Sequence, residues 1–210
     1  MGPEVLTAVT GALTALLALS FGIPQVLHIR RTRSVAGISL PSITNSLVST
    51  TAWLAYGIWL GDVWVTITSL VGLPALAAAG WVALRHGASR RGMWVPAVWA
   101  ATLLAALLVT PLLSTAFATV LGASVLWYVT PAALTAWRSS DVSGIAAGTW
   151  LLLLADGAVA GAYGVLADVP AYLVYAVTAA LGALAVLARL WWRWAPACGE
   201  CPPVAACACP

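Results

Sequence analysis

The chain has 210 residues, of which 62% are hydrophobic and only 7% are charged, and its mean hydropathy is +1.00. Nine arginines, four aspartates, two glutamates and no lysine are too few charges to cover the surface of a soluble domain of this size. The composition therefore predicts a helical membrane protein with several spans. The net charge of +3 does not indicate nucleic-acid binding, because the arginines are scattered between long apolar runs.

Charges divide the chain into apolar runs, and a run of about 20 residues is enough for one membrane-spanning helix. The stretch 92–137 has no charge over 46 residues, so it must hold two spans, with a hinge at residues 111–114. This gives seven predicted spans: residues 5–27, 34–61, 63–84, two within 92–137, 142–167 and 169–188.

The arginines predict the direction in which these spans cross the membrane. If the N-terminus lies outside, every arginine falls in an inner loop or after residue 188, while Glu4, Asp62 and Asp168 lie outside. This is the distribution that the positive-inside rule describes. No basic segment precedes the first run, so we expect it to be a span and not a cleaved signal peptide. The prediction is a multi-pass protein of the plasma (inner) membrane with a cytosolic C-terminus.

An internal repeat gives the strongest organisational signal. Residues 24–57 and 131–164 align without a gap at a constant spacing of 107 residues, with matches that include Pro24/Pro131, Arg31/Arg138, Gly37/Gly144 and Tyr56/Tyr163. One linker span between the repeats gives both the same orientation, so the predicted fold is two parallel three-helix repeats joined by a linker helix, a 3+1+3 arrangement. The corresponding segments are residues 1–86, 87–115 (the linker), 116–194 and a Cys- and Pro-rich tail at 195–210.

Two motifs carry a family resemblance. Phe21-Gly-Ile-Pro-Gln-Val, followed by a short basic loop and Val35-Ala-Gly-Ile-Ser, resembles the PQ-loop signature. Trp53-Leu-Ala-Tyr-Gly-Ile, followed by Gly61-Asp62, resembles the SWEET and SemiSWEET sugar transporters. The resemblance covers residues 5–84 well and 117–188 more loosely. It implies a transporter that moves a small polar solute, with a sugar as the first candidate, by alternating access between the repeats.

The resemblance also implies an inner gate. Pro24 and Pro131 lie late in their spans, where a proline removes a backbone hydrogen bond and kinks a helix. The family places a ring of four prolines near this gate, where Pro24, Pro41 and Pro131 fit and Gly148 stands at the fourth position. The alternative is that membrane helices simply tolerate these prolines. Gln25 is expected either to latch the inner gate or to make an ordinary interhelical hydrogen bond.

Substrate-binding and outer-gate residues follow from the same resemblance. Trp53 would offer an apolar plane to a sugar ring, and Ser69 and Tyr175 stand at or next to the positions where the family has a hydroxyl-binding asparagine. Packing inside the protein or contact with lipid is the alternative for Trp53. The outer gate would consist of Tyr56, Asp62, Tyr163 and Asp168. Because Leu60 replaces the family arginine that pairs with Asp62, a solvated loop residue is the alternative for this aspartate.

Asp156 is the one acidic residue inside a predicted span, and no span holds a lysine or arginine to neutralise it. An intramembrane carboxylate is costly and is a functional hypothesis by default. It would couple transport to protons, or else stay protonated and donate a structural hydrogen bond to Ser49, Thr50 or Thr51.

Three functional hypotheses therefore remain open: a sugar transporter, a proton-coupled amino-acid carrier of the PQ-loop type, and a non-transporting receptor with the same fold. Enzyme motifs are absent from the sequence, so no catalytic activity and no cofactor are expected. The partners expected are the small solute and membrane lipid, and a homo-oligomer is compatible with the sequence. Cys198, Cys201, Cys207 and Cys209 have the spacing of a soft-metal site, but a short terminal Pro- and Ala-rich segment favours an unstructured tail without metal.

Overall fold

The structure, a computed structural model, describes residues 2–109 and 114–194, and within these ranges it contains α-helices and loops but no strand. The all-helical prediction is confirmed. The expected tail at 195–210 and most of the expected hinge at 111–114 lie outside the described residues. The described helices are α1 (Pro3–Ser20), α2 (Ile23–Thr32), α3 (Leu40–Leu60), α4 (Val63–Arg85), α5 (Trp94–Val109), α6 (Ser114–Gly122), α7 (Val125–Arg138), α8 (Ala147–Leu166) and α9 (Pro170–Trp194).

Five helical segments of the described chain are long and apolar enough to cross a membrane: Pro3–Thr32, Val63–Arg85, Phe117–Arg138, Ala147–Leu166 and Pro170–Trp192. The sequence predicts seven spans, and the two others correspond to α3 and α5. Helix α3 has 21 residues, but its buried serines and Asn45 make it more polar. Helix α5 is apolar but shorter. The chain is therefore a multi-pass membrane protein, and the polar side chains of α3 named above are buried inside the bundle.

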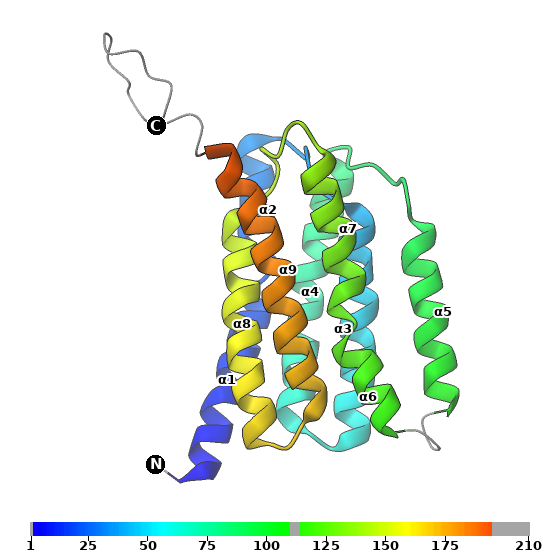
Figure 1. Cartoon of the computed structure of the whole chain (residues 1–210), viewed down its shortest axis with the longest axis vertical. Coiled ribbons are helices and arrows are strands. Elements are labelled where there is room, and N and C mark those ends of the chain that lie inside the picture. Colours follow the sequence, from blue (N-terminus) through cyan, green and yellow to red (C-terminus); the bar gives the residue numbers. More distant parts are fainter. Residues whose placement is uncertain (1, 110–113, 195–210) are drawn as a thin grey trace.

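The helices form two groups with the same internal order (Figure 1). In the first group α4 packs between α1 and α3, and in the second group α9 packs between α8 and α7. Contacts of α1 with α8 and of α3 with α7 join the groups, while α5 packs against α3 at the edge. This packing matches the internal repeat of the sequence. We call the groups the first half (α1–α4) and the second half (α6–α9).

The first helical rod breaks between α1 and α2. Gly22 lies against α4 so closely that an added Cβ atom would be 2.4 Å from the backbone oxygen of Ala75. Pro24 then occupies the first turn of α2. A proline is well tolerated there, because the first N–H groups of a helix have no intrahelical partner. The expected mid-helix kink at Pro24 is therefore a break between two helices, whereas Pro131 does lie inside α7.

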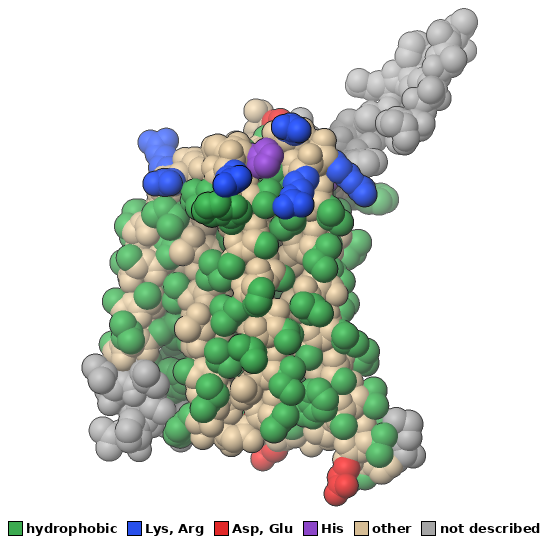
Figure 2. All heavy atoms as spheres, turned by 180° about the vertical axis from the view of Figure 1, so that it is seen from behind, with side chains coloured by type: hydrophobic (Ala, Val, Ile, Leu, Met, Phe, Trp, Pro, Cys, Tyr) green, Lys and Arg blue, Asp and Glu red, His purple; other side chains and the backbone are tan. Residues whose placement is uncertain are grey.

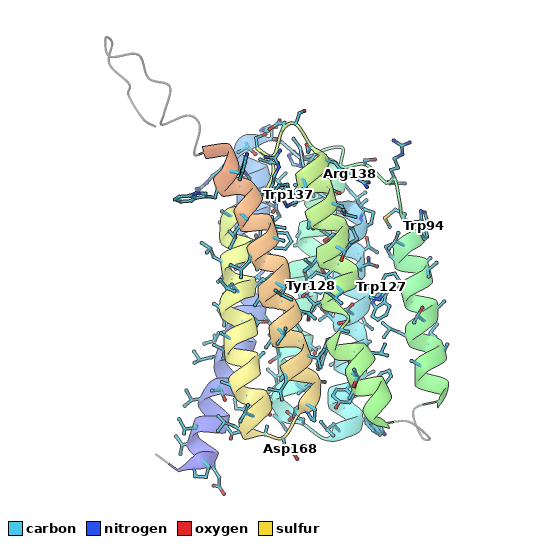
Figure 3. All side chains as sticks on the ribbon, in the orientation of Figure 1. Trp94, Trp127, Tyr128, Trp137, Arg138 and Asp168 are labelled. Atoms are coloured by element: carbon cyan, nitrogen blue, oxygen red, sulfur yellow. The ribbon has the colours of Figure 1, made fainter. Side chains whose placement is uncertain are left out.

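The two ends of the bundle differ in charge. Arg31, Arg85 and Arg138 lie in the last turns of α2, α4 and α7, and Figure 2 shows arginines gathered at this end, opposite the N-terminus. At the other end, Asp168 lies in the short α8–α9 turn (Figure 3), and Asp62 lies in the short α3–α4 turn (Figure 1). We call these the arginine end and the acidic end. Many large apolar side chains between them are exposed, as lipid contact requires.

Candidate functional site

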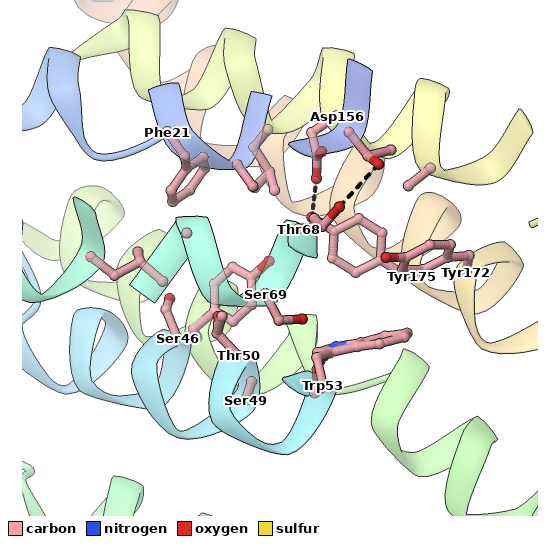
Figure 4. A pocket seen from close by; sticks show the side chains of 18 residues that line it. Phe21, Ser46, Ser49, Thr50, Trp53, Thr68, Ser69, Asp156, Tyr172 and Tyr175 are labelled. Carbon is pink, nitrogen blue, oxygen red and sulfur yellow. Dashed lines mark hydrogen bonds between the residues drawn. The ribbon is translucent and has the colours of Figure 1, made fainter. Parts of the chain in front are cut away.

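A cavity lies between the two halves and is lined by side chains from both (Figure 4). It holds about 730 Å³ of unoccupied space, a volume that includes the part open to the outside. Its walls carry aromatic rings and many hydroxyl groups, and of the described residues that line it Asp156 is the one acidic residue and none is basic. The hydroxyl-bearing Ser and Thr side chains are those of Thr14, Ser46, Ser49, Thr50, Thr68, Ser69 and Ser124.

Trp53 and Tyr172 form an aromatic wall of the cavity. Trp53 is 7% exposed, so the alternative that this side chain contacts lipid is wrong. Its ring centroid lies 5.0 Å from that of Tyr172, and its Nε1 donates to the Ser124 hydroxyl at 3.4 Å. The indole is thus held by ring contacts and one long hydrogen bond while it lines the cavity.

Asp156 lies on α8 with one oxygen engaged and one free. The Tyr175 hydroxyl donates to its Oδ2, whereas its Oδ1 is buried and has no hydrogen-bond partner within residues 2–109 and 114–194. The expected partners Ser49, Thr50 and Thr51 do not bind it. Ser49 instead accepts a hydrogen bond from Trp99 Nε1 at 2.8 Å. The correct partner, Tyr175, lies on the neighbouring helix α9.

The other residues implied for substrate binding also line the cavity. The buried Ser69 hydroxyl already donates to the Val65 carbonyl at 2.9 Å, so towards a ligand it is left as a hydrogen-bond acceptor. Tyr175 is bound to Asp156, as described above. The cavity thus brings Trp53, Ser69, Asp156 and Tyr175 together.

At the arginine end, Gln25 bridges the two halves. Its Nε2 donates to the Gly144 carbonyl at 2.8 Å, and its Oε1 accepts from the Ala146 amide at 3.2 Å. Gly144 packs directly on the first-half loop, because an added Cβ would lie 2.7 Å from backbone atoms of Ala36. The repeat counterpart of Gln25 is Ala132, which has no amide to offer. The bridge therefore comes from the first half alone.

A second cavity continues from the central one towards this end. The two share Phe21, Ser46, Leu76 and Tyr128, and the second extends to Gln25 and its neighbours. A solute leaving the central cavity towards the arginine end would therefore pass these four shared side chains and then the Gln25 bridge.

Only part of the expected proline ring is brought together. Gly148 faces Pro24, with its ideal Cβ position 3.3 Å from the proline Cβ, so glycine leaves room where a larger residue would press on the α2 break. Pro41 is buried in the first turn of α3. Pro131 lies inside α7 and removes the N–H that would bond to the Trp127 carbonyl.

Side chains of α3 satisfy the backbone near Pro131. The Ser42 hydroxyl donates to the Tyr128 carbonyl at 2.6 Å, and Asn45 Nδ2 donates to the Trp127 carbonyl at 2.5 Å. Both side chains are buried. Neither residue is among those predicted from the sequence, although two amide- or hydroxyl-bearing side chains three positions apart on an apolar helix are a usable signal.

At the acidic end, Asp62 has two tasks. Its Oδ1 accepts from the amides of Trp64 and Val65, both at 2.9 Å, and so caps α4. The Tyr163 hydroxyl of the second half donates to both carboxylate oxygens at 2.9 and 2.8 Å. The interpretation of Asp62 as merely a solvated loop residue is therefore wrong.

The four residues expected at this end do not form one cluster. Tyr56 is buried and packs against Trp53 and Phe117, with ring centroids 5.8 and 6.0 Å apart. Asp168 is exposed in the α8–α9 turn with a positive φ of 54°. Asp62 and Tyr163 are thus the pair that bridges the halves.

Tyr128, Tyr172 and Ser124 also line the central cavity, and the sequence analysis missed them. Tyr172 and Tyr175 are three residues apart and so share one helix face, which was the available signal. Ser124 lies between α6 and α7, at a break that the sequence analysis did not predict.

Comparison with known families supports part of this assignment. Residues 6–66 match the family model described as PQ loop repeat. The match extends from α1 to the start of α4 and so includes Gln25, Trp53 and Asp62. It supports the PQ-loop family, and hence a membrane protein of the transporter or receptor type. No curated protein and no solved structure shows a significant match to the chain.

Proposed function

We propose that this protein is a transporter that moves a small polar solute, with a sugar as the first candidate, by alternating access between its two halves. The central cavity carries this proposal, because both halves line it and polar bridges between the halves lie at each end. Breaking the Gln25 bridge or the Asp62–Tyr163 pair in turn would open the cavity to one side and then the other. No chemical change of the solute is part of the proposal.

The arrangement in the membrane belongs to the same proposal. Two parallel three-helix repeats joined by α5, with the N-terminus outside, would place the arginine end in the cytosol. The identical packing order of the two halves and the charge difference between the ends support this orientation in the plasma membrane.

The chemistry of the cavity favours a neutral polyhydroxylated solute over an amino acid. Trp53 and Tyr172 offer apolar ring surface, and serine and threonine hydroxyls can exchange hydrogen bonds with a sugar. A zwitterionic amino acid would find Asp156 for its ammonium group, but none of the described lining residues is a cation for its carboxylate. Burying the carboxylate of the amino acid in this cavity without a cationic partner is costly.

Uptake into proteoliposomes from a panel of radiolabelled sugars and amino acids tests the proposal. We expect saturable flux of one or more sugars, and a strong increase in the apparent KM in Trp53→Ala. Trp59→Ala is the matched control, because Trp59 lies two turns further along α3 and is exposed. Flux of amino acids alone would overturn the sugar assignment, and binding without any flux would indicate the receptor alternative.

A second candidate, a proton-coupled carrier, is favoured by the free Oδ1 of Asp156. A carboxylate that binds a proton in one state and releases it in another would link flux to a pH gradient. We expect Asp156→Asn to abolish accumulation driven by an inward proton gradient while downhill exchange continues. Asp168→Asn, which changes an exposed carboxylate outside the cavity, is the control. Normal accumulation by Asp156→Asn would make Asp156 structural, and no pH response in the wild-type protein would leave a plain facilitator.

A further inference from the structure

The internal repeat pairs two hydrogen bonds that lie across the halves. Ser42 and Thr149 are repeat counterparts, and so are Tyr128 and Phe21, each pair at the same spacing of 107 residues. The Ser42 hydroxyl donates to the Tyr128 carbonyl at 2.6 Å. The counterpart bond would run from the Thr149 hydroxyl to the Phe21 carbonyl.

That counterpart bond is absent from the structure. Thr149 is 8% exposed, and its hydroxyl has no hydrogen-bond partner within the described part of the chain. A buried hydroxyl without a partner is uncommon and unfavourable, because it has lost its bonds to water without replacement.

The Phe21 carbonyl is a suitable acceptor. The first bond of the α2 ladder runs from the Val26 amide to the Gly22 carbonyl at 3.1 Å, so the Phe21 carbonyl lies just before that ladder. Pro24 has no N–H with which to bond the carbonyl of Ser20, the residue before Phe21. The regular helical hydrogen bonding is therefore interrupted in this stretch of backbone.

Thr149 and Phe21 both line the second cavity, together with Gln25. Gly148, next to Thr149, already touches the Pro24 ring region, with its ideal Cβ position 3.3 Å from the proline Cβ. A small closing movement of α2 towards the start of α8 would shrink this cavity and bring the hydroxyl to the carbonyl.

We propose that Thr149 is a positioning residue whose hydroxyl donates to the Phe21 carbonyl in a second conformation of the transport cycle. The structure holds the α3–α7 contact closed through Ser42 and leaves the α8–α2 contact without its equivalent bond. The second conformation forms that bond and shrinks the second cavity beside the Gln25 bridge, which already joins the halves at this end. This inference rests on the proposed alternating access but is independent of the identity of the solute.

Spin-label distances test the second conformation without any substrate. The labels go on Arg31→Cys in α2 and Ala147→Cys in α8, both exposed, in a chain whose four tail cysteines are replaced by serine. We expect two distance populations in this background. Thr149→Val, which keeps the shape and removes the hydroxyl, should lose the shorter one, and Thr149→Ser should restore it.

Melting temperatures and solute exchange rates test the proposal independently of the spin-label distances. Thr149→Val removes an unsatisfied hydroxyl from the observed conformation, so its melting temperature should equal or exceed that of the wild type. Its solute exchange should nevertheless be about fivefold to tenfold slower, the factor expected for one buried hydrogen bond. Ser42→Ala, which removes a bond already formed, should instead lower the melting temperature.

Several outcomes would overturn the inference: a single distance population in the wild-type background, unchanged populations in Thr149→Val, or a Thr149→Ser variant that behaves like Thr149→Val. Two populations with the expected response, in a protein that transports no solute of the panel, would overturn the proposed function and leave this conformational assignment standing.

Discussion

Asp62 shows how a single side chain can join a helix start to a contact between the halves. Its carboxylate caps α4 through two amides and receives the Tyr163 hydroxyl from α8. A carboxylate at a helix N-terminus is favoured by hydrogen bonding and by the helix dipole. Removing Asp62 therefore perturbs both a helix start and the contact between the halves, whereas removing the Tyr163 hydroxyl perturbs that contact alone.

This difference gives a prediction for two variants. Asp62→Ala should lower the free energy of unfolding by about 1 kcal/mol through loss of the cap and should also loosen the acidic end. Tyr163→Phe should leave the cap intact and raise the labelling rate of a cysteine at Ser124 in the central cavity from the acidic side. Unfolding in detergent and thiol labelling in vesicles measure the two effects. Equal labelling rates in Tyr163→Phe and the wild type would show that the pair does not restrict access.

At the same scale, the sequence indicated some cavity residues and missed others. Trp53, Asp156 and Gln25 were identifiable because a tryptophan in a motif, a carboxylate in a span and a glutamine after proline are each unusual in apolar sequence. The hydrogen-bond partner of Asp156 was not identifiable. The internal repeat suggests Ser49, Thr50 or Thr51, and the sequence gives no reason to prefer Tyr175 over them. Only the contact between α8 and α9 decides in favour of Tyr175.

At the scale of elements, the two repeats break their first rod at different places. The first breaks at Phe21–Gly22, while the second breaks between α6 and α7, ahead of Pro131. The difference has a local cause, because α3 supplies Ser42 and Asn45 to the carbonyls freed near Pro131 and so allows that proline to remain inside a helix. A matched pair of prolines in the sequence therefore predicted equivalent weak points but not equivalent geometry.

Proline replacements test whether these weak points move during transport. Pro24→Ala and Pro131→Ala should each slow exchange about fivefold, which corresponds to about 1 kcal/mol in the barrier, with membrane insertion and solute affinity largely unchanged. For Pro131→Ala the reason is that a new N–H competes with Asn45 for the Trp127 carbonyl and straightens α7. Exchange kinetics in proteoliposomes provide the measurement.

Pro74→Ala is the control for this experiment, because Pro74 lies inside α4 and is exposed, away from the contact between the halves. Its exchange rate should match that of the wild type. If Pro24→Ala and Pro131→Ala also exchange at the wild-type rate, these prolines are tolerated without acting as hinges.

At the scale of the whole molecule, the arginine end should face the cytosol. We expect a cysteine at Ser89 to react with an impermeant thiol reagent only from the cytosolic side, and a cysteine at Glu4 only from the outside, in a chain without the tail cysteines. Both positions are exposed. Intact cells and inverted vesicles give opposite labelling patterns if this orientation holds. Reaction of position 89 in intact cells would contradict it.

The sequence was sufficient for the helical class and for the difference in charge between the two ends, because charges and apolar runs follow directly from the energetics of a bilayer. It was less informative about α3, whose buried serines and Asn45 face the other helices and lower its hydropathy. Nor could it place the cavity, which depends on which helices touch. The order α1–α4–α3, repeated as α7–α9–α8, follows from packing and not from chain order.

The bridges between the halves also bear on how the sequence can change during evolution. Gln25, Ser42 and Asn45 all contribute side chains of the first half, and the groups they bind at Gly144, Tyr128 and Trp127 are backbone carbonyls of the second. A carbonyl is present whatever residue carries it, so positions 127 and 128 can accumulate substitutions without losing these bonds, whereas position 144 is confined to glycine by its close approach to the Ala36 backbone. The first half has no such freedom, and it is the first half that the PQ loop repeat matches.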